Sequence, residues 1–256
     1  MLIASPRHSA SDVDHWIHIS KTDIVHAKLA RFRGKVERAL VAIDYFLRKN
    51  PCAYVGTSWG KDSVVTADLV LRVDPKISLV NIQNGRNVPF TSEVRDRFMS
   101  SHTEATLSIV DTSHEAIGPK QDKYLRTDWR DYEGFRQAGI QFGEHRITGI
   151  RGTESSVRAM SLMVHGTATE KSCRPIIRWT GQDVWSYLAL HNLPIHPIYA
   201  MTMGGAYERD RLRVGNIGGE IGDLTGREEH ELRYFPQEYK DAKKRLHEDR
   251  IHYADE

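Results

Sequence analysis

VGTSWGKDS, residues 55–63, lies between a short apolar run and a helix-like segment. Backbone N–H groups at the start of a helix are unpaired and carry a partial positive charge, so a loop in this place can bind anions. Gly60 permits a close backbone approach, Lys61 adds a full positive charge and Ser63 adds a hydroxyl donor. The stretch therefore predicts a phosphate-binding loop between a strand and a helix.

The spacing within this loop excludes two other phosphate-binding motifs. A Walker A loop has four residues between its glycines and Ser or Thr directly after its Lys. Here three residues separate Gly56 from Gly60, and Asp62 follows Lys61. The glycine pattern of a Rossmann dinucleotide site is absent as well. We therefore do not expect a kinase, a GTPase or a dinucleotide-binding protein of these types.

Strand-like and helix-like runs alternate along most of the chain. Apolar runs of strand type lie at residues 52–58, 76–82, 105–111, 145–150 and 175–179. Helix-like segments lie at residues 26–50, 64–73, 89–101, 124–138, 154–165, 181–192 and 236–252. This alternation predicts a doubly wound α/β fold, with a mainly parallel five-stranded sheet and helices on both faces. Ligands of such sheets bind beyond the carboxyl ends of the strands.

Composition limits the class of protein. The chain has 256 residues, a formal net charge of +2 and no apolar run near the roughly 18 residues that a membrane span needs. We therefore expect a cytoplasmic protein, and the charge neither indicates nor excludes nucleic-acid binding. Its two cysteines, Cys52 and Cys173, cannot form a disulfide framework or hold an iron–sulfur cluster alone.

The loop SWGKDS, residues 58–63, resembles the PP-loop of the ATP pyrophosphatases, which is usually written S-G-G-x-D-S. Lys61 stands at the variable position, as is common in the PAPS reductase branch. Trp59 departs from the pattern because it replaces the first glycine. Since tryptophan is disfavoured in the backbone conformations that glycine can adopt, either position 59 is unstrained or the loop has a different geometry.

A second segment, TGIRGTESSVR at residues 148–158, is similar to the G-[IL]-R-x-x-E-S-x-x-R segment of PAPS reductase-like proteins. Gly149 would let a nucleotide approach the strand end, and Arg151 would offer a forked donor to phosphate. Glu154 and Arg158 lie four residues apart and can pair on one helix face, as they also would in an ordinary surface ion pair.

Two further stretches, at residues 174–188 and 192–199, continue the resemblance, which thus extends from residue 55 to residue 199. Trp179, Trp185 and Tyr187 in these stretches are expected to be mainly core residues. We expect residues 1–22 to form an irregular N-terminal arm and residues 23–199 to form the PP-loop nucleotide-binding α/β domain. Residues 200–256 would then form a glycine-rich loop and helical extension of the same domain.

The resemblance also implies roles for individual residues. Lys61, Ser63 and the loop amides would hold the phosphates, Arg151 and Arg213 would neutralise developing charge, and Asp62 would order the loop or bind Mg²⁺. Catalysis is expected of Lys61, Asp62 and Arg151. The residues expected to bind the nucleotide are Thr57, Ser58, Trp59, Gly60, Lys61, Asp62, Ser63, Gly149, Ile150, Arg151, Glu154, Arg158 and Arg213.

The chain departs from its relatives where they carry cysteines. Many have a pattern like R-x-G-C-x-x-C, and Asn216 and Gly219 stand here in place of its cysteines. The C-terminal tail also lacks the cysteine that attacks sulfur in true PAPS reductases, so neither that complete reaction nor an iron–sulfur cluster is expected. Arg209, Arg211 and Arg213 could close over an anionic substrate or belong to a solvated loop.

These observations favour an ATP pyrophosphatase that cleaves ATP between the α- and β-phosphates and so adenylates and activates a substrate. Similar proteins serve sulfur insertion into DNA (phosphorothioation), which would imply DNA as a partner and a cysteine desulfurase as the sulfur donor. A PAPS or APS reductase-type sulfurtransferase and a non-catalytic adenine-nucleotide sensor remain as alternatives. The sequence does not decide the oligomeric state, and a homodimer stays open.

Overall fold

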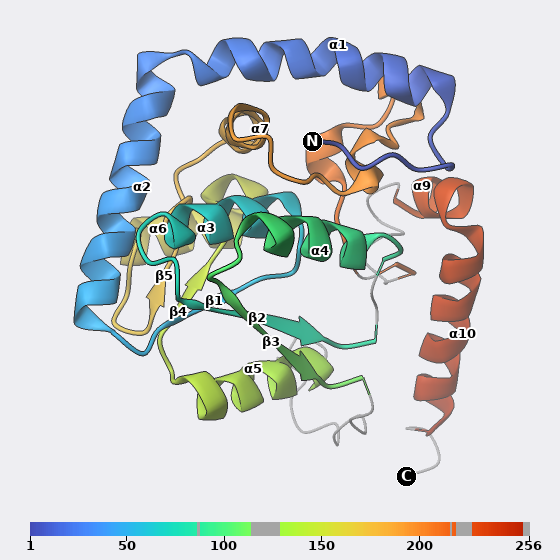
Figure 1. Ribbon diagram of the computed structural model, residues 1–256. Coiled ribbons are helices and arrows are strands. Elements are labelled where there is room, and N and C mark those ends of the chain that lie inside the picture. The colour runs from blue at the N-terminus through green and yellow to red at the C-terminus, as the bar shows by residue number, and fades with distance from the viewer. Residues whose placement is uncertain (86–87, 114–128, 216, 219–226, 253–256) are drawn as a thin grey trace.

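A parallel sheet of five strands forms the centre of the molecule (Figure 1). The computed structural model describes residues 1–85, 88–113, 129–215, 217–218 and 227–252. The strands lie in the order β3-β2-β1-β4-β5, and each neighbouring pair is parallel. Their bounds are β1 Tyr54–Gly56, β2 Ser78–Gln83, β3 Thr106–Asp111, β4 Arg146–Thr148 and β5 Ser172–Cys173. The chain therefore winds outward from β1 in one direction and then in the other, so strand order reverses between β1 and β4.

Helices cover both faces of this sheet (Figure 1). Helix α5 packs on one face, where Ala138 joins Tyr54, Val80 and Val110 in a small apolar cluster. The larger core lies on the other face, beneath α2, α3, α4 and α7. The helices are α1 Ala10–Ala27, α2 Ala30–Lys49, α3 Lys61–Leu71, α4 Thr91–Ser101, α5 Trp129–Phe142, α6 Ser156–His165, α7 Gly181–Leu190, α9 Arg227–Tyr234 and α10 Pro236–His252. This architecture confirms the predicted doubly wound α/β fold.

The fifth strand lies elsewhere than predicted. We expected it at residues 175–179, but β5 ends at Cys173 and the following residues form a turn, in which the Ile177 N–H donates to the Arg174 carbonyl. Pro175 has no N–H to offer to a strand ladder, which favours the turn. Ile176 and Ile177 are nevertheless fully buried. The apolar run that suggested a strand therefore reflects their position in the core.

The N-terminal segment is helical from Ala10 onward, so the expectation of an irregular arm over residues 1–22 was wrong for residues 10–22. Helix α1 begins with a capping box, in which the Ser9 hydroxyl accepts from the Asp12 N–H and the Asp12 carboxylate accepts from the Ser9 N–H. Asp12 is fully buried and also accepts the N–H groups of Thr202 and Gly204. Polar contacts fasten α1 to the C-terminal region, and apolar periodicity does not detect such contacts.

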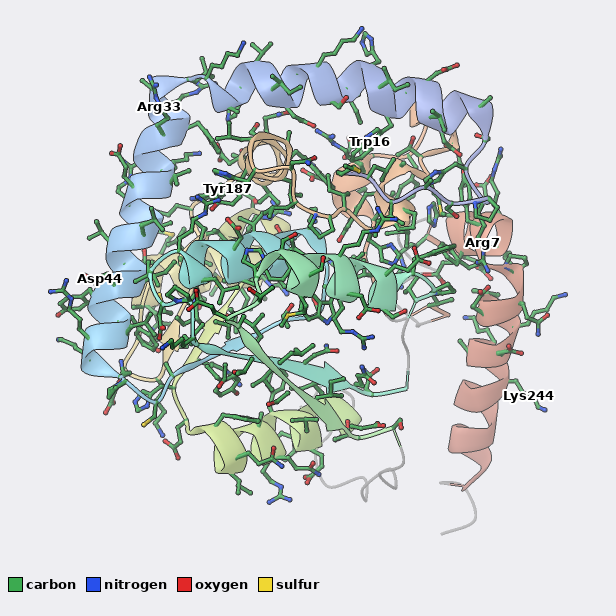
Figure 2. The ribbon with its side chains drawn as sticks, viewed as in Figure 1. Arg7, Trp16, Arg33, Asp44, Tyr187 and Lys244 are labelled. Carbon is green, nitrogen blue, oxygen red and sulfur yellow. The ribbon has the colours of Figure 1, made fainter. Side chains whose placement is uncertain are left out.

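Further contacts tie the chain start to its end. The Arg7 guanidinium donates to the Tyr234 carbonyl at 2.9 Å and pairs with Glu238 at 2.6 Å, beside α9 and α10 (Figure 2). Helix α10 was predicted over residues 236–252 and has those bounds. The helix predicted over residues 124–138 is α5, which begins at Trp129; the preceding residues 114–128 lie outside the described part of the chain. Among the described helices, none is long and apolar enough to cross a membrane.

Asp183 joins three helices at the start of α7. Its carboxylate accepts from the Thr180 N–H and hydroxyl. Its own N–H donates to the Thr180 hydroxyl oxygen at 3.3 Å, as the predicted N-cap at Thr180 requires. It also pairs with Lys35 of α2 and with His26 of α1. Burial works to raise the pKa of Asp183, but the hydrogen bonds from these partners outweigh burial and lower this pKa to about 2.

We predict that Asp183→Asn lowers the free energy of unfolding by about 2–4 kcal/mol, because a buried charged acceptor is lost. Since the folded pKa of Asp183 lies below its unfolded value of 3.8, its stabilisation is present above about pH 4 and is lost as pH falls towards 2. Urea unfolding at several pH values measures both effects. Asp44→Asn, which removes an exposed pair with Arg48, should cost less than about 0.5 kcal/mol. Equal losses in both variants would contradict this account.

Candidate nucleotide-binding site

Within the predicted phosphate-binding stretch, residues 55–63, residues 57–60 connect the carboxyl end of β1 to the first turn of α3. The Ser63 hydroxyl in that turn donates to the Gly60 carbonyl at 3.0 Å and accepts from the Ser58 N–H at 3.2 Å. The Thr57 N–H donates to a carbonyl of β2 at 2.9 Å. These bonds order the loop from within, and a direct contact of Ser63 with phosphate stays a prediction.

Trp59 adopts the left-handed backbone conformation, with φ of 60°. This answers the question that its replacement of a glycine raised, because the loop keeps a conformation that suits glycine. The side chain is 1% exposed, and its ring packs against Phe98 of α4 with the centroids 5.7 Å apart. Its indole N–H has no hydrogen-bond partner among the described residues. The burial of the Trp59 ring offsets the free-energy cost of the left-handed backbone at this residue.

Two glycines of the motifs allow close packing around the loop. Gly60 has an ordinary φ of −76°, but a Cβ there would lie 3.0 Å from Val214 and 3.2 Å from the Tyr199 hydroxyl. A Cβ at Gly149 would lie 2.6 Å from the Asp62 carbonyl oxygen. We had expected Gly149 to make room for a nucleotide, and in the structure it makes room for the first turn of α3. The close approach of this turn to the end of β4 brings the two motifs together.

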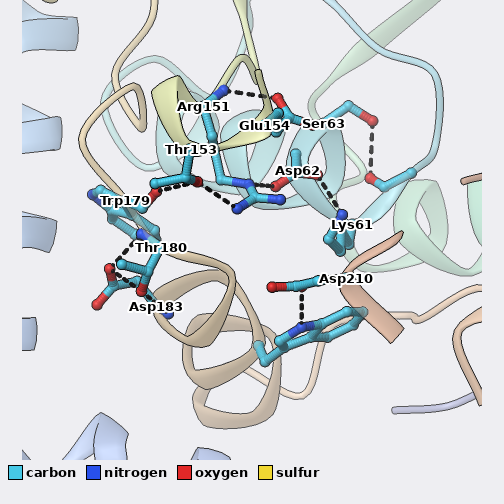
Figure 3. A network of polar contacts seen from close by, with 12 residues as sticks. Lys61, Asp62, Ser63, Arg151, Thr153, Glu154, Trp179, Thr180, Asp183 and Asp210 are labelled. Atoms are coloured by element: carbon cyan, nitrogen blue, oxygen red, sulfur yellow. Dashed lines mark hydrogen bonds and ion pairs between the residues drawn. The ribbon is translucent and has the colours of Figure 1, made fainter. Parts of the chain in front are cut away.

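Asp62 bridges the two cations that the motifs supply (Figure 3). One carboxylate oxygen accepts from Lys61 Nζ at 2.9 Å, and the other accepts from Arg151 Nε at 2.6 Å. The side chains of Lys61 and Arg151 are each 4% exposed, whereas that of Asp62 is 14% exposed. The trio carries a net charge of +1 at the N-terminus of α3, where the unpaired backbone N–H groups add a partial positive charge.

Both cations of this trio remain protonated. Burial works to lower the pKa of Lys61, but Tyr199 and Asp62 outweigh burial and raise this pKa above its ordinary value. Burial likewise works to lower the pKa of Arg151, and the negative charges of Asp62 and of two further carboxylates, one of them Asp210, raise it instead. A ligand that enters the site therefore meets two fixed positive charges.

The remainder of the second motif wraps around Arg151. Its N–H donates to Glu154 at 3.0 Å, and its Nη1 donates to the Thr153 hydroxyl at 3.1 Å. Glu154 pairs with Arg158 as expected, although Glu154 ends the 3₁₀ helix η1 (Gly152–Glu154) and Arg158 belongs to α6. Ile150 is half-buried beside them. Glu154 thus holds both the backbone of Arg151 and the side chain of Arg158.

Two residues that sequence analysis did not assign to the site also belong to it. The Tyr199 hydroxyl accepts from the Lys61 N–H at 3.1 Å, and its ring centroid lies 5.3 Å from Lys61 Nζ. Asp210 accepts from the Trp185 indole N–H at 2.7 Å and lies across from Lys61 and Arg151 (Figure 3). Tyr199 lies in the stretch at residues 192–199 that continues the family resemblance. Asp210 lies between Arg209 and Arg211, and no motif indicated a role for it.

Two of the three alternating arginines have acidic partners in the structure. Arg209, in the 3₁₀ helix η4 (Arg209–Arg211), makes a bidentate pair with Asp23 of α1 at 2.6 and 2.9 Å. Arg211 pairs with Glu208 at 3.3 Å on the surface. Arg209 is therefore not available to close over a substrate.

Arg213 remains a candidate for substrate contact. It is exposed, and the following residue, Val214, lies against the position where Gly60 would carry a side chain. Asn216 and Gly219, which replace the cysteines of the family pattern, lie outside the described residues.

Neither cysteine presents a thiolate to the loop. Cys52 is exposed but precedes β1, at the end of this strand opposite the loop. Cys173 is fully buried, and burial raises the pKa of its thiol to about 12. Because a thiolate is the required nucleophile, neither residue is suited to attack sulfur in this site.

Comparisons with known proteins find similar sequences over most of the α/β domain. The family model "Phosphoadenosine phosphosulfate reductase domain" matches residues 53–212. A phosphoadenosine 5'-phosphosulfate reductase of Xanthomonas euvesicatoria is 25% identical over 198 residues, which are 72% of this chain and 77% of the relative. One of Xanthomonas campestris is 26% identical over 226 residues, which are 83% and 88% of the two chains. The solved PAPS reductase of Candida auris, in a phosphate complex, is 17% identical, covers 76% of this chain and 91% of its own, and has a TM-score of 0.47.

The chain belongs to the PAPS reductase domain family, because the family model matches more than half of its length. This confirms the resemblance to PP-loop proteins that the loop at residues 58–63 indicated. The matched range includes the loop, the Arg151 segment and the η4 segment, and it ends directly before Arg213.

We predict that Trp59→Gly destabilises the fold by about 1–4 kcal/mol. Loss of a buried tryptophan costs about 3–5 kcal/mol, and release of the left-handed backbone returns about 1–2 kcal/mol. Asn192→Gly is the matched control, since Asn192 also has a positive φ of 50° but an exposed side chain, and it should be neutral or stabilising. Urea unfolding measures both. A stabilised Trp59→Gly variant would show that backbone strain exceeds the packing of the ring.

Proposed function

We propose that this protein is an ATP pyrophosphatase that cleaves ATP between the α- and β-phosphates and so adenylates an acceptor. One observation carries the proposal. Lys61 and Arg151 form a buried pair of cations, bridged by Asp62, beyond the carboxyl ends of the two central strands. That edge, where strand order reverses, is the place at which doubly wound sheets bind their ligands.

The positions of Lys61 and Arg151 suit α–β cleavage of ATP. An acceptor oxygen attacks the α-phosphorus, the bond from that phosphorus to the bridging oxygen breaks, and pyrophosphate leaves with the electron pair. Negative charge grows on the leaving group, and we assign its stabilisation to Lys61, Arg151 and the loop amides, because positioned cations are most effective in buried sites. Arg213, exposed beside the loop, would add to it at the rim.

Mg²⁺ would shield the charge between the phosphates when it is bound. We had assigned Asp62 either to Mg²⁺ or to loop order. Both oxygens of its carboxylate are engaged by Lys61 and Arg151, which favours the second role. We therefore propose that Asp62 orients the two cations and does not bind the metal directly.

We further propose DNA as the acceptor, in sulfur insertion into its backbone. Arginines border the site from three segments: the half-buried Arg158 from α6, the exposed Arg178 before α7, and the exposed Arg211 and Arg213 from the η4 segment. Such residues suit contacts with a phosphate backbone. Because neither cysteine of the chain can present a thiolate in the site, the sulfur would come from a partner such as a cysteine desulfurase.

A second candidate function is sulfonucleotide reduction of the PAPS or APS type. The relatives in Xanthomonas carry that name, which supports it. The chain would then need a thiol from another molecule, since Cys173 is buried and Cys52 precedes the opposite end of β1.

ATP labelled at the α-phosphate, incubated with the protein and Mg²⁺, tests the proposed reaction. We expect labelled AMP or an adenylated product, together with pyrophosphate. Lys61→Ala and Arg151→Ala should each lower the rate by about 100-fold or more, because each removes a charge that stabilises the leaving group. Arg48→Ala, which removes an exposed arginine of α2, should leave the rate unchanged.

Three other outcomes would separate the rival functions. Release of ADP and phosphate would exclude α–β cleavage. Sulfite release from PAPS with dithiothreitol as the thiol, without turnover of ATP, would favour the reductase. Tight nucleotide binding without any turnover would favour an adenine-nucleotide sensor.

DNA as the acceptor is tested by the salt dependence of binding to a short duplex. Replacing Arg178 and Arg211 by Ala should weaken binding and reduce the slope of log affinity against log salt by about 2, since about one counterion is released per phosphate contact. Arg31 and Arg33 form the matched control pair, because both are exposed in the first turn of α2, where Figure 2 labels Arg33. Equal losses in both double variants would contradict a DNA path beside the site.

A further inference from the structure

Arg209 is clamped between two tryptophans and an aspartate. Its guanidinium makes both hydrogen bonds of the pair with Asp23, and its central carbon lies 4.4 Å from the ring centroid of Trp185 and 5.5 Å from that of Trp16. Trp16 points inward from α1 (Figure 2). The Arg209 side chain is 11% exposed and that of Asp23 is 4% exposed. A bidentate, stacked and largely dehydrated arginine holds its own backbone firmly.

The residue that this clamp holds in place is Asp210. One of its carboxylate oxygens accepts from the Trp185 indole N–H, and this same ring stacks on Arg209. The other oxygen lies directly over Gly181, where a Cβ would come within 1.6 Å of it. The first residue of α7 must therefore be a glycine for Asp210 to keep this position.

The direction of Asp210 is informative because it faces the proposed phosphate site (Figure 3). Its negative charge is among those that raise the pKa of Arg151. A carboxylate opposite bound phosphates would repel them unless a cation lay between. The oxygen of Asp210 over Gly181 accepts no hydrogen bond from the described residues, whereas both oxygens of Asp62 are engaged.

We propose that Asp210 is the carboxylate through which the site holds the divalent cation of its bound nucleotide, and that Arg209 is the positioning residue that keeps Asp210 there. The inference rests on the proposed nucleotide site. Mg²⁺ is usually held by one or two protein carboxylates together with substrate phosphates and waters. This fits a chain whose described residues contain no cluster of three or more metal-binding side chains.

The clamp gives the N-terminal helix a part in the site. Asp23 and Trp16 belong to α1, so this helix fixes the η4 segment. Residues that orient a metal ligand commonly change metal affinity by about 10–100-fold when replaced. Arg209→Lys retains the charge near Asp23 but loses the planar fork, so it should weaken metal binding without unfolding the protein.

Mn²⁺ binding, followed by the electron paramagnetic resonance signal of the free ion, tests the proposal with the full chain. The measurement is made with the α,β-methylene analogue of ATP and, separately, with inorganic pyrophosphate. We expect Asp210→Asn to weaken Mn²⁺ binding by more than about tenfold and Arg209→Lys by about tenfold. Thermal unfolding should show that both variants remain folded. Glu208→Gln is the matched control, because it makes the same change on an exposed side chain two residues away, and it should bind as the unchanged protein does.

The outcomes separate this inference from the proposed function. Equal Mn²⁺ affinity of Asp210→Asn and the unchanged protein with both ligands would overturn the metal role of Asp210. Arg209→Lys with unchanged affinity would overturn the positioning role of Arg209. Neither ligand can be cleaved between an α- and a β-phosphorus atom, so Mn²⁺ binding does not depend on that reaction. If the ATP assay shows no α–β cleavage, weaker Mn²⁺ binding by Asp210→Asn would still support the metal site.

Discussion

Two cations lie almost fully buried at the carboxyl edge of the sheet, and Asp62 is the charge that permits them to do so. Without it, Lys61 and Arg151 would repel each other in a dehydrated place, and burial would favour loss of the Lys61 proton. The bridge also couples the first turn of α3 to the segment after β4. One carboxylate therefore balances the charge of the site and links its two motifs.

The bridge depends in turn on backbone packing. Asp62 and Arg151 come from segments that follow neighbouring strands, and they meet because Gly149 lets the first turn of α3 approach the end of β4. Gly60 similarly admits the Tyr199 hydroxyl, which accepts the first N–H of α3. That N–H is one of those that a phosphate could use, so Tyr199 reduces the number of free donors at this helix start. The charged side chains consequently carry more of the expected anion binding.

Sequence reasoning predicted those parts of this arrangement that have a local pattern. The loop, the Arg151 segment and the alternation of strands and helices all lie within short stretches whose residue types and spacing indicate their structure. The fifth strand was misplaced because Ile176 and Ile177 are apolar for reasons of burial and form no ladder. The place of Asp210 in the site could not be predicted from the sequence. It depends on contacts with Trp185 and Gly181, which are 25 and 29 positions earlier in the chain.

The N-terminal helix α1 shows why apolar periodicity does not predict contacts between polar residues that are distant in the chain. Its buried residues include Asp12 and Asp23, and each is satisfied by groups from the C-terminal half of the chain. A buried carboxylate costs free energy unless it is paired, so these two residues select one arrangement of distant segments over others. Asp12 fastens α1 to the region around Thr202, and Asp23 fastens α1 to Arg209. Because Asp210 follows Arg209 directly, the contact that stabilises this helix also determines where a carboxylate lies relative to the proposed phosphate site.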